Sequence, residues 1–378
     1  MDLELSEDQK MLRKTARDFL VNECTKPFVR EMERDEKGYS PDLWQKMADL
    51  GWMGLPFPEQ CGGWGGGFLD LAVLMEEMGR ACLPGPFLSS VVLAGLTILE
   101  AGSNAQKEQY LTAIAKGDIF TLALTEPNGD YHPASIGTRA DDQDDGFVIT
   151  GTKFYVPDAH VASHLLVLAH SSKFDLQPRE NYLSLFLVDA KSPGIKCTPL
   201  KTIGSDKQCE VIFDNVRVPK ANLVGEINHG WPAVQKTLQL AAVAKCAEMV
   251  GAAQQVLEMT VAYAKERIQF DKPIGSFQAI QHHCANMLID IDGMRMLTYE
   301  AAWLLSAGLP ADKEVAMAKA WVSDAIVRVA KLGHQVHGGV GYTIDHDLQL
   351  YYRRGRAAAS LFGDANYHRE MIASKLGL

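Results

Sequence analysis

The sequence lacks several patterns that assign a protein to a class at once. Its seven cysteines are scattered and odd in number, and no two of them form a CxxC pair. This distribution argues against a disulfide scaffold or a cysteine zinc site, and it is typical of buried thiols in a reducing compartment, so we expect a cytoplasmic protein. No run approaches the roughly 20 apolar residues of a membrane-spanning helix. The acidic, periodic N-terminus contains no apolar core of a signal peptide.

Concentrated positive charge is also missing. The chain has 37 Lys and Arg against 47 Asp and Glu, a formal net charge of −10. Neutralising nucleic-acid phosphates needs clustered Lys and Arg, so we expect no nucleic-acid partner. At 47% hydrophobic and 22% charged residues, the composition is that of an ordinary globular protein. A length of 378 residues is too great for one simple core and predicts two or three domains.

The common short motifs of nucleotide-binding and hydrolytic enzymes are absent as well. The sequence has no GK[ST] loop and no GxSxG elbow. The HGGVG segment at 337–341 follows no predicted strand and lacks the G-x-G-x-x-G spacing, which argues against a Rossmann domain. Two histidine pairs have no third ligand at a useful spacing, so we predict no metal site: His282 with His283, and His334 with His337.

Hydrophobic periodicity divides the chain into three parts. Residues 1–119 show helical patterns, beginning with a capping box at Ser6 and Gln9. Residues 120–225 contain short β-branched or alternating runs separated by Asp, Gly and Pro, which predict a compact, mostly antiparallel β domain. Residues 226–378 are again helical. We therefore predict an α+β fold with an N-terminal all-α domain, a middle β domain and a C-terminal four-helix bundle.

The bundle is predicted from long periodic segments with short connections. The expected helices lie at 232–267, 276–307, 312–336 and 357–376, and the breaks between them contain Gly or Pro. Four long helices joined in this way are typical of an antiparallel bundle.

Three segments combine residues that suit a nucleotide cofactor. "LALTEP" at 122–127 ends a predicted strand with a hydroxyl and a carboxylate. "RIQFDKPIGSFQAIQ" at 267–281 places an arginine, an aromatic ring and a glutamine around a helix break, and an arginine fork suits a pyrophosphate. "QVHGGVGY" at 335–342 ends a helix in glycines that permit close approach of a ligand or another backbone. Each segment alone is equally well explained as a structural break.

Taken together, these segments resemble the acyl-CoA dehydrogenase family. "LTEP", "GTK", "FDNVRVPKANLVG", "RIQFDKPIGSFQAIQ" and "QVHGGVGY" occur in that order, and the resemblance spans nearly the whole chain. It implies a tetramer built as a dimer of dimers, with FAD lying between the β domain and the bundle. It also implies an acyl-CoA substrate, from which a carboxylate takes the α-proton while the β-hydrogen leaves as hydride. Electrons then pass to an electron-transfer flavoprotein.

The resemblance implies a role for specific residues. Leu124 and Thr125 are expected against the flavin ring, Tyr155 is expected to shield it, and Tyr131 is expected near the CoA. The adenine and pyrophosphate end of an FAD held mainly by the neighbouring subunit is expected to meet Arg267, Phe270, Ile274 and Gln278. The same FAD is expected to meet, across the subunit interface, Gln335, Val336, Gly338 and Gly339.

The sequence departs from the family at the positions that carry the chemistry. Where the family usually has a Glu base, this chain has Gly363, followed by Asp364. The position on the first bundle helix that holds the Glu in a minority of members is Ala241, and the Arg that accompanies it is Ala242. Pro157 replaces the Thr that contacts the flavin.

Asp364 therefore has two interpretations. It acts as the catalytic base if Gly363 re-aims the turn and keeps its N–H for the thioester carbonyl, or it simply caps the helix that follows, since Asp is a favoured N-cap. Tyr367 and His368 are further candidate proton donors.

Three functions follow: an FAD-dependent acyl-CoA dehydrogenase acting on a short, branched or alicyclic acyl group, a non-catalytic subunit of a heterotetramer, and an oxidase or elimination variant. The short, branched or alicyclic acyl group is suggested by the segment at 83–95, which brings bulky residues to the helices expected to line the acyl pocket.

Overall fold

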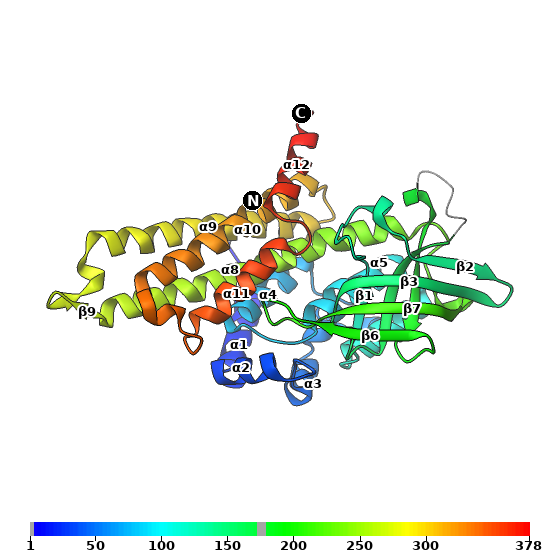
Figure 1. Ribbon diagram of the computed structural model, residues 1–378, viewed down its shortest axis with the longest axis horizontal. Coiled ribbons are helices and arrows are strands. Elements are labelled where there is room, and N and C mark those ends of the chain that lie inside the picture. Colours follow the sequence, from blue (N-terminus) through cyan, green and yellow to red (C-terminus); the bar gives the residue numbers. More distant parts are fainter. Residues whose placement is uncertain (1–3, 172–178) are drawn as a thin grey trace.

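The protein is built from a helical part, a sheet and a second helical part in chain order (Figure 1). A computed structural model describes residues 4–171 and 179–378. The predicted fold class is confirmed, because the central sheet is flanked in sequence by two helical regions.

The N-terminal part begins with the predicted capping box. The Ser6 hydroxyl accepts from the Gln9 N–H at 3.2 Å, and the Gln9 side chain accepts from the Ser6 N–H at 3.1 Å. The α-helices of this part are α1 (Glu7–Glu23), α2 (Lys26–Arg34), α3 (Pro41–Asp49), α4 (Phe68–Ala81), α5 (Leu96–Ala101), α6 (Asn104–Gln106) and α7 (Thr112–Ala115). Two π-helical segments connect them, η3 (Leu88–Gly95) and η4 (Lys107–Leu111).

The middle part is one sheet with the strand order β6-β7-β3-β2-β4-β5-β8, and β1 pairs with β4 beside this path. Its strands are β1 (Phe120–Ala123), β2 (Arg139–Gln143), β3 (Gly146–Pro157), β4 (His164–His170), β5 (Leu183–Asp189), β6 (Ile195–Leu200), β7 (Gln208–Pro219) and β8 (Leu223–Val224). Most pairs are antiparallel, as predicted, while β1 and β2 run parallel to β4.

The C-terminal part contains the long helices α8 (Gly230–Glu266), α9 (Gln278–Ser306) and α10 (Asp312–His337), close to the predicted positions. The single helix expected at 357–376 is wrong. The chain instead forms α11 (Leu348–Ser360) and α12 (Ala365–Lys375), separated by a turn. Phe362 and Gly363 have positive φ values of 59° and 90°, and a right-handed helix cannot continue through such residues.

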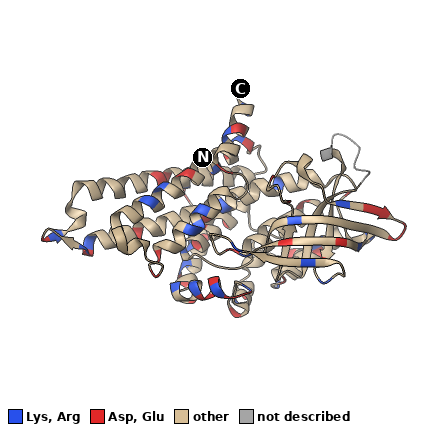
Figure 2. Cartoon of the chain, in the orientation of Figure 1, with Lys and Arg blue, Asp and Glu red and all other residues tan. Residues whose placement is uncertain are grey.

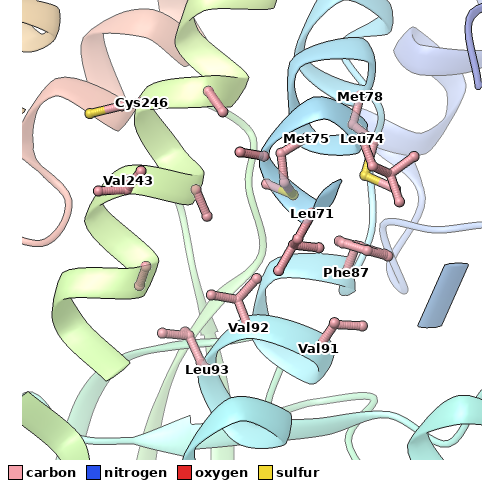
Figure 3. Close-up of a cluster of buried hydrophobic side chains, with 14 of the residues drawn as sticks. Leu71, Leu74, Met75, Met78, Phe87, Val91, Val92, Leu93, Val243 and Cys246 are labelled. Atoms are coloured by element: carbon pink, nitrogen blue, oxygen red, sulfur yellow. The ribbon is translucent and has the colours of Figure 1, made fainter. Parts of the chain in front are cut away.

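Helices α4 and α8 cross with their backbones in contact. A Cβ atom at Gly79 would lie 1.9 Å from the Glu248 carbonyl oxygen, and one at Gly251 would lie 1.7 Å from the Glu76 carbonyl oxygen. Only glycine permits this approach. Apolar side chains of α4, η3 and α8 belong to one buried cluster, and Figure 3 shows Leu71 and Val92 lying close together between α4 and η3.

The bundle and the sheet lie at opposite ends of the molecule (Figure 1). A short hairpin of β9 (Ile268–Gln269) and β10 (Lys272–Pro273) joins α8 to α9 and forms the end of the bundle far from the sheet. Acidic and basic residues are interspersed along the elements (Figure 2). Among the described residues, no helix is long and apolar enough to cross a membrane.

Candidate functional site

A cavity of roughly 170 Å³ lies where the first helical part, the sheet, α8 and the end of α11 meet. Much of its wall is apolar and comes from α4, η3, β1 and α8: Met75, Met78, Leu88, Leu93, Leu122 and Leu238. Ala241 and Ala242 of α8 are fully buried, and their small side chains project no functional group. An apolar cavity with a few polar groups is the usual form of a small-molecule site.

One end of the cavity contains the residues expected near the flavin ring together with Tyr131, which is expected near the CoA. Leu124, Thr125, Tyr131 and Tyr155 all line it. Burial raises the pKa of the Tyr131 phenol, so this hydroxyl stays protonated at neutral pH. The Thr125 hydroxyl already donates to the Phe154 carbonyl at 2.5 Å, so it is available to a ligand as an acceptor. The structure thus brings these four residues together.

The carboxylate of the "LTEP" segment has a structural role. Glu126 accepts from the N–H groups of Gly137 and Thr138 at 2.8 and 2.9 Å and pairs with the buried Lys153 ammonium at 2.9 Å. Burial by itself raises the pKa of Glu126, but Lys153 and Thr138 outweigh it, and the pKa is lowered. Lys153 also donates to the Leu124 carbonyl at 3.0 Å, which fixes the backbone beside the cavity.

The turn between α11 and α12 closes the same end of the cavity. Leu361 and Phe362 line the cavity, and the Phe362 N–H donates to the Tyr131 hydroxyl at 3.1 Å. Gly363 is different. A Cβ atom built on it would lie 2.3 Å from Cδ1 of Tyr367 and 3.0 Å from Nε2 of His368. A side chain at position 363 would therefore point into α12, and the turn as it stands has no room for one.

Asp364 caps α12. Its carboxylate accepts from the Tyr367 N–H at 2.8 Å, its backbone is extended, and its side chain is exposed. It lines a separate surface hollow with Asp324 and Arg356, and it is not among the residues that line the apolar cavity. In this fold the Asp364 carboxylate caps α12. To act as a base, it would have to break its hydrogen bond with the Tyr367 N–H and turn toward the cavity.

Two buried side chains hold the turn from behind. The Lys319 ammonium is fully buried and donates to the Gly363 carbonyl at 2.8 Å, the Ala359 carbonyl at 3.1 Å and the Ser323 hydroxyl at 2.9 Å. Burial lowers the pKa of Lys319 to about 8. His368 donates from Nε2 to the Phe362 carbonyl at 2.9 Å, and burial lowers its pKa to about 4. His368 is therefore neutral at physiological pH, and its bonded nitrogen is the donor.

The remaining predicted residues gather at the far end of the bundle. Arg267 ends α8, Phe270 is 84% exposed at the hairpin tip, and Gln278 begins α9 and is also exposed. Ile274 is partly exposed in the turn between the hairpin and α9. A flat group has open access to this surface.

The glycine segment lies beside this hairpin. His337, at the end of α10, stacks on Tyr263 of α8 with ring centroids 4.4 Å apart, one turn before Arg267. Gln335 is exposed, and a Cβ atom at Gly338 or Gly339 would meet nothing within 4 Å. Val336 is buried, so its side chain is unavailable to a ligand in this arrangement.

The two groups of predicted cofactor residues are far apart within one chain. Lys245 of α8 lines the cavity, and Arg267 ends the same helix 22 residues later. At about 1.5 Å per residue, that is roughly 33 Å along the helix axis. The hairpin of one chain is therefore too distant to complete that chain's own cavity, and it faces away from it (Figure 1).

The cavity also contains charged residues that sequence reasoning missed. Asp158 follows β3 and accepts from the buried Ser89 hydroxyl at 2.6 Å, while Lys245 and Glu248 of α8 form an ion pair at 2.6 Å. The i, i+3 spacing of the last two was readable, but nothing in the sequence placed them at a cavity. Asp158 and Ser89 are 69 positions apart, so only the fold reveals their contact.

Comparison with known proteins agrees with the resemblance found from the sequence motifs, and it does so along nearly the whole chain. Residues 6–118, 121–216 and 228–377 match the N-terminal, middle and C-terminal domains of acyl-CoA dehydrogenases, respectively. The chain is 34% identical to a probable acyl-CoA dehydrogenase, YngJ, of Bacillus subtilis over 100% of both chains. It belongs to the acyl-CoA dehydrogenase family.

Two further proteins similar to this chain are named as parts of complexes. The caffeyl-CoA reductase-Etf complex subunit CarC of Acetobacterium woodii is 33% identical, over 98% of each chain. A chain of the ChsE4-ChsE5 complex from Mycobacterium tuberculosis superposes with a TM-score of 0.90 at 31% identity, covering 100% of this chain and 99% of that one. The acyl-CoA dehydrogenase described here is an oxidoreductase that acts on acyl-CoA, with dehydrogenase activity coupled to electron transfer.

The acyl-CoA dehydrogenase family depends on FAD, and the residues present fit that cofactor. The open space above Gly338 and Gly339 and the exposed Phe270 ring leave room for a nucleotide. At the cavity, Tyr155 is 47% exposed beside Leu124 and Thr125, so an aromatic ring system has a partner there.

Proposed function

We propose that this chain is one subunit of an FAD-dependent acyl-CoA dehydrogenase with two kinds of subunit. The proton-accepting carboxylate belongs to the related subunit and acts in that subunit's own active site. The observation that carries the proposal is the turn after α11. Position 363 has no side chain and no room for one, and the Asp364 carboxylate is engaged in capping α12. Ala241 leaves the alternative base position empty of a functional group.

In this arrangement the hairpin end of the chain serves the flavin of the related subunit. FAD, when bound, accepts the hydride from the β-carbon of the acyl group. Arg267, Phe270, Ile274 and Gln278 would hold its adenine and pyrophosphate end, and Gln335, Gly338 and Gly339 would meet the same FAD. The exposure of the hairpin, and its distance of roughly 33 Å from this chain's own cavity, support the assignment.

The chain keeps an acyl-CoA cavity of its own. Tyr131 lies at the end expected for the CoA thioester, and Leu124, Thr125 and Tyr155 form the flavin-facing wall. Among short, branched and alicyclic acyl groups, we take the alicyclic class, because the wall formed by Met75, Met78, Leu93 and Leu238 is apolar and comes from three helical elements, α4, η3 and α8. Electrons leave to an electron-transfer flavoprotein, and we propose a cytoplasmic heterotetramer.

The test compares the chain purified alone with the chain co-expressed with a related subunit from the same source. Each preparation is reconstituted with FAD and titrated anaerobically with a panel of acyl-CoAs while flavin absorbance is recorded. We expect bleaching only in the co-expressed complex. Rapid bleaching of the chain alone, as a homo-oligomer, would contradict the proposal.

A second candidate keeps catalysis on this chain, with Asp364 as the base in a homotetramer. It is favoured by the Gly363 N–H, which donates to no residue that the structure describes and so remains free to polarise a thioester carbonyl. The two candidates differ in the effect of Asp364→Asn. Asparagine also caps a helix, so the substitution removes a base while leaving the cap.

A further inference from the structure

We propose that the acyl cavity contains a hydroxyl-recognition point, formed by Asp158, Ser89 and Lys245, and that the acyl group carries a hydroxyl away from its thioester. The inference rests on the proposed function, because it takes the cavity as the acyl-CoA site. It adds the chemical class of the acyl group.

The Asp158 carboxylate is fixed with one oxygen left open. Oδ2 accepts from the Ser89 hydroxyl at 2.6 Å, and Ser89 is fully buried. The backbone is held too, because the Asp158 N–H donates to the Lys207 carbonyl at 2.9 Å and its φ is 54°. Oδ1 accepts a hydrogen bond from no residue in the described ranges, and Asp158 lines the cavity. A single acceptor of fixed position therefore faces the space where the acyl group binds.

The unpaired Oδ1 of Asp158 favours a ligand that carries a hydrogen-bond donor. A buried polar atom that loses water without gaining a hydrogen bond costs free energy, so an acyl group that is apolar throughout is disfavoured here. The rest of this wall is apolar, with Leu93, Leu122 and Pro157 nearby in the lining. One polar point in an apolar wall gives strong discrimination between a ligand that satisfies it and one that does not.

Lys245 restricts which donor group the ligand can carry at this point. It lines the same cavity, is 8% exposed, and pairs with Glu248 at 2.6 Å, its one hydrogen-bond partner among the residues described. Its remaining N–H groups are free to donate. Lys245 favours the charged form of the Asp158 carboxyl electrostatically, as His160 does, while Asp206 opposes it. A hydroxyl group donates to a carboxylate and accepts from an ammonium, whereas an amine is repelled by Lys245 and a ketone has nothing to donate to Asp158.

The experiment measures binding and does not need turnover. The FAD-loaded full-length protein, in its complex if it forms one, is titrated calorimetrically with cyclohexanecarboxyl-CoA and with the 2-, 3- and 4-hydroxy derivatives. We expect at least one hydroxylated ligand to bind about tenfold more tightly than the unsubstituted one, as for one hydrogen bond to a charged group.

Two variants test whether the preference for a hydroxylated ligand comes from Asp158. Asp158→Asn keeps a residue that tolerates positive φ and can still meet Ser89, but it removes the charged acceptor, so the hydroxyl preference should fall to about threefold or less. Glu33→Gln is the matched control, because Glu33 also lines the cavity but its carboxylate is engaged by Arg353. This control should keep the full preference. The unfolding temperature of each variant is measured alongside.

The outcomes separate this inference from the proposed function. If the wild-type protein binds the unsubstituted and hydroxylated ligands equally, the recognition point is wrong and the acyl-CoA site stands. If Asp158→Asn keeps the wild-type preference, the assignment to Asp158 is wrong. If no acyl-CoA of the series binds, the proposed acyl-CoA cavity fails together with the inference.

Discussion

Restoring the family's glutamate at position 363 should not restore a base. The Gly363→Glu variant places a Cβ atom 2.3 Å from the Tyr367 ring carbon Cδ1, and it does so on a backbone with φ of 90°. The new side chain would start out toward α12, and the carboxylate would need a rebuilt turn to reach the cavity. We therefore expect a destabilised chain with no gain in activity.

The size of the loss follows from two effects. A side chain at positive φ costs about 1–2 kcal/mol, and inserting atoms into a packed site costs typically about 1–3 kcal/mol more. The sum is about 2–5 kcal/mol. With an unfolding entropy of about 2.1 cal/mol/K per residue, the whole chain has about 0.8 kcal/mol/K, so the unfolding temperature should fall by about 3–6 °C.

A matched glycine separates the two effects. Gly308 also has a positive φ of 66°, but a Cβ atom there meets nothing within 4 Å. Gly308→Glu should therefore lose only the backbone share, about 1–2 kcal/mol. Calorimetry on both variants, with anaerobic flavin reduction of the purified chain, provides the comparison. A Gly363→Glu protein that is as stable as Gly308→Glu and reduces its flavin with acyl-CoA would refute the reasoning about side-chain direction.

Three further predictions concern charged residues near the site. Asp364→Asn should leave flavin reduction by the complex unchanged, whereas Asp364→Ala should lose about 1 kcal/mol of stability through the helix cap; a large drop in the rate for Asp364→Asn would instead identify a base. Burial lowers the pKa of the Lys319 ammonium from 10.5 to about 8 in the folded chain. Between about pH 8 and 10.5, Lys319 is therefore protonated in the unfolded chain and neutral in the folded chain. Wild type should therefore gain stability relative to Lys319→Met as the pH rises from 7 to 10, by about 2.5 kcal/mol, and a flat difference in calorimetry would contradict this. Burial raises the pKa of Asp158 to about 6, so its charged form destabilises the fold above that pH. Asp158→Asn should then be more stable than wild type at pH 7.5, by at most about 3 kcal/mol, with the advantage disappearing toward pH 4 in thermal unfolding.

Much of the architecture was readable from local patterns. The long apolar periods of α8, α9 and α10 and the capping box at Ser6 are properties of neighbouring residues, and the structure keeps them in place. The division into helical, sheet and helical parts follows from the change of period alone. Residues within about ten positions of one another carry this information, so no knowledge of tertiary contacts is needed.

The break between α11 and α12 was not readable in the same way. The sequence around it is rich in helix formers, and the interruption includes Phe362, a bulky residue at positive φ. Lys319, Tyr131 and His368 hold this turn by hydrogen bonds to its backbone. Those partners are up to 231 positions away, so the conformation is imposed by tertiary contacts that override local propensity.

Sequence alone leaves two roles open for Asp364, for a related reason. A helix cap and a catalytic base both call for the same residue type, so composition cannot separate them. The difference lies in the direction of the carboxylate, which the φ of Gly363 and the position of α12 set. Lys319 was missed although it lies on the buried stripe of α10 with Val315 and Val322, and a lysine at that spacing is a readable sign of a buried cation.

Helix α8 joins two parts of the protein that serve different active sites under the proposed function. One face near Lys245 lines the chain's own cavity, and the end at Arg267 presents the hairpin. Because each residue of a helix turns the chain by about 100° and advances it by about 1.5 Å, inserting a single residue between them would swing the hairpin to another side of the bundle. Only changes of a whole number of turns, such as seven residues, would keep its orientation, and these would move it by about 10 Å. The number of residues in α8 is therefore itself constrained by assembly, independently of which side chains the helix carries.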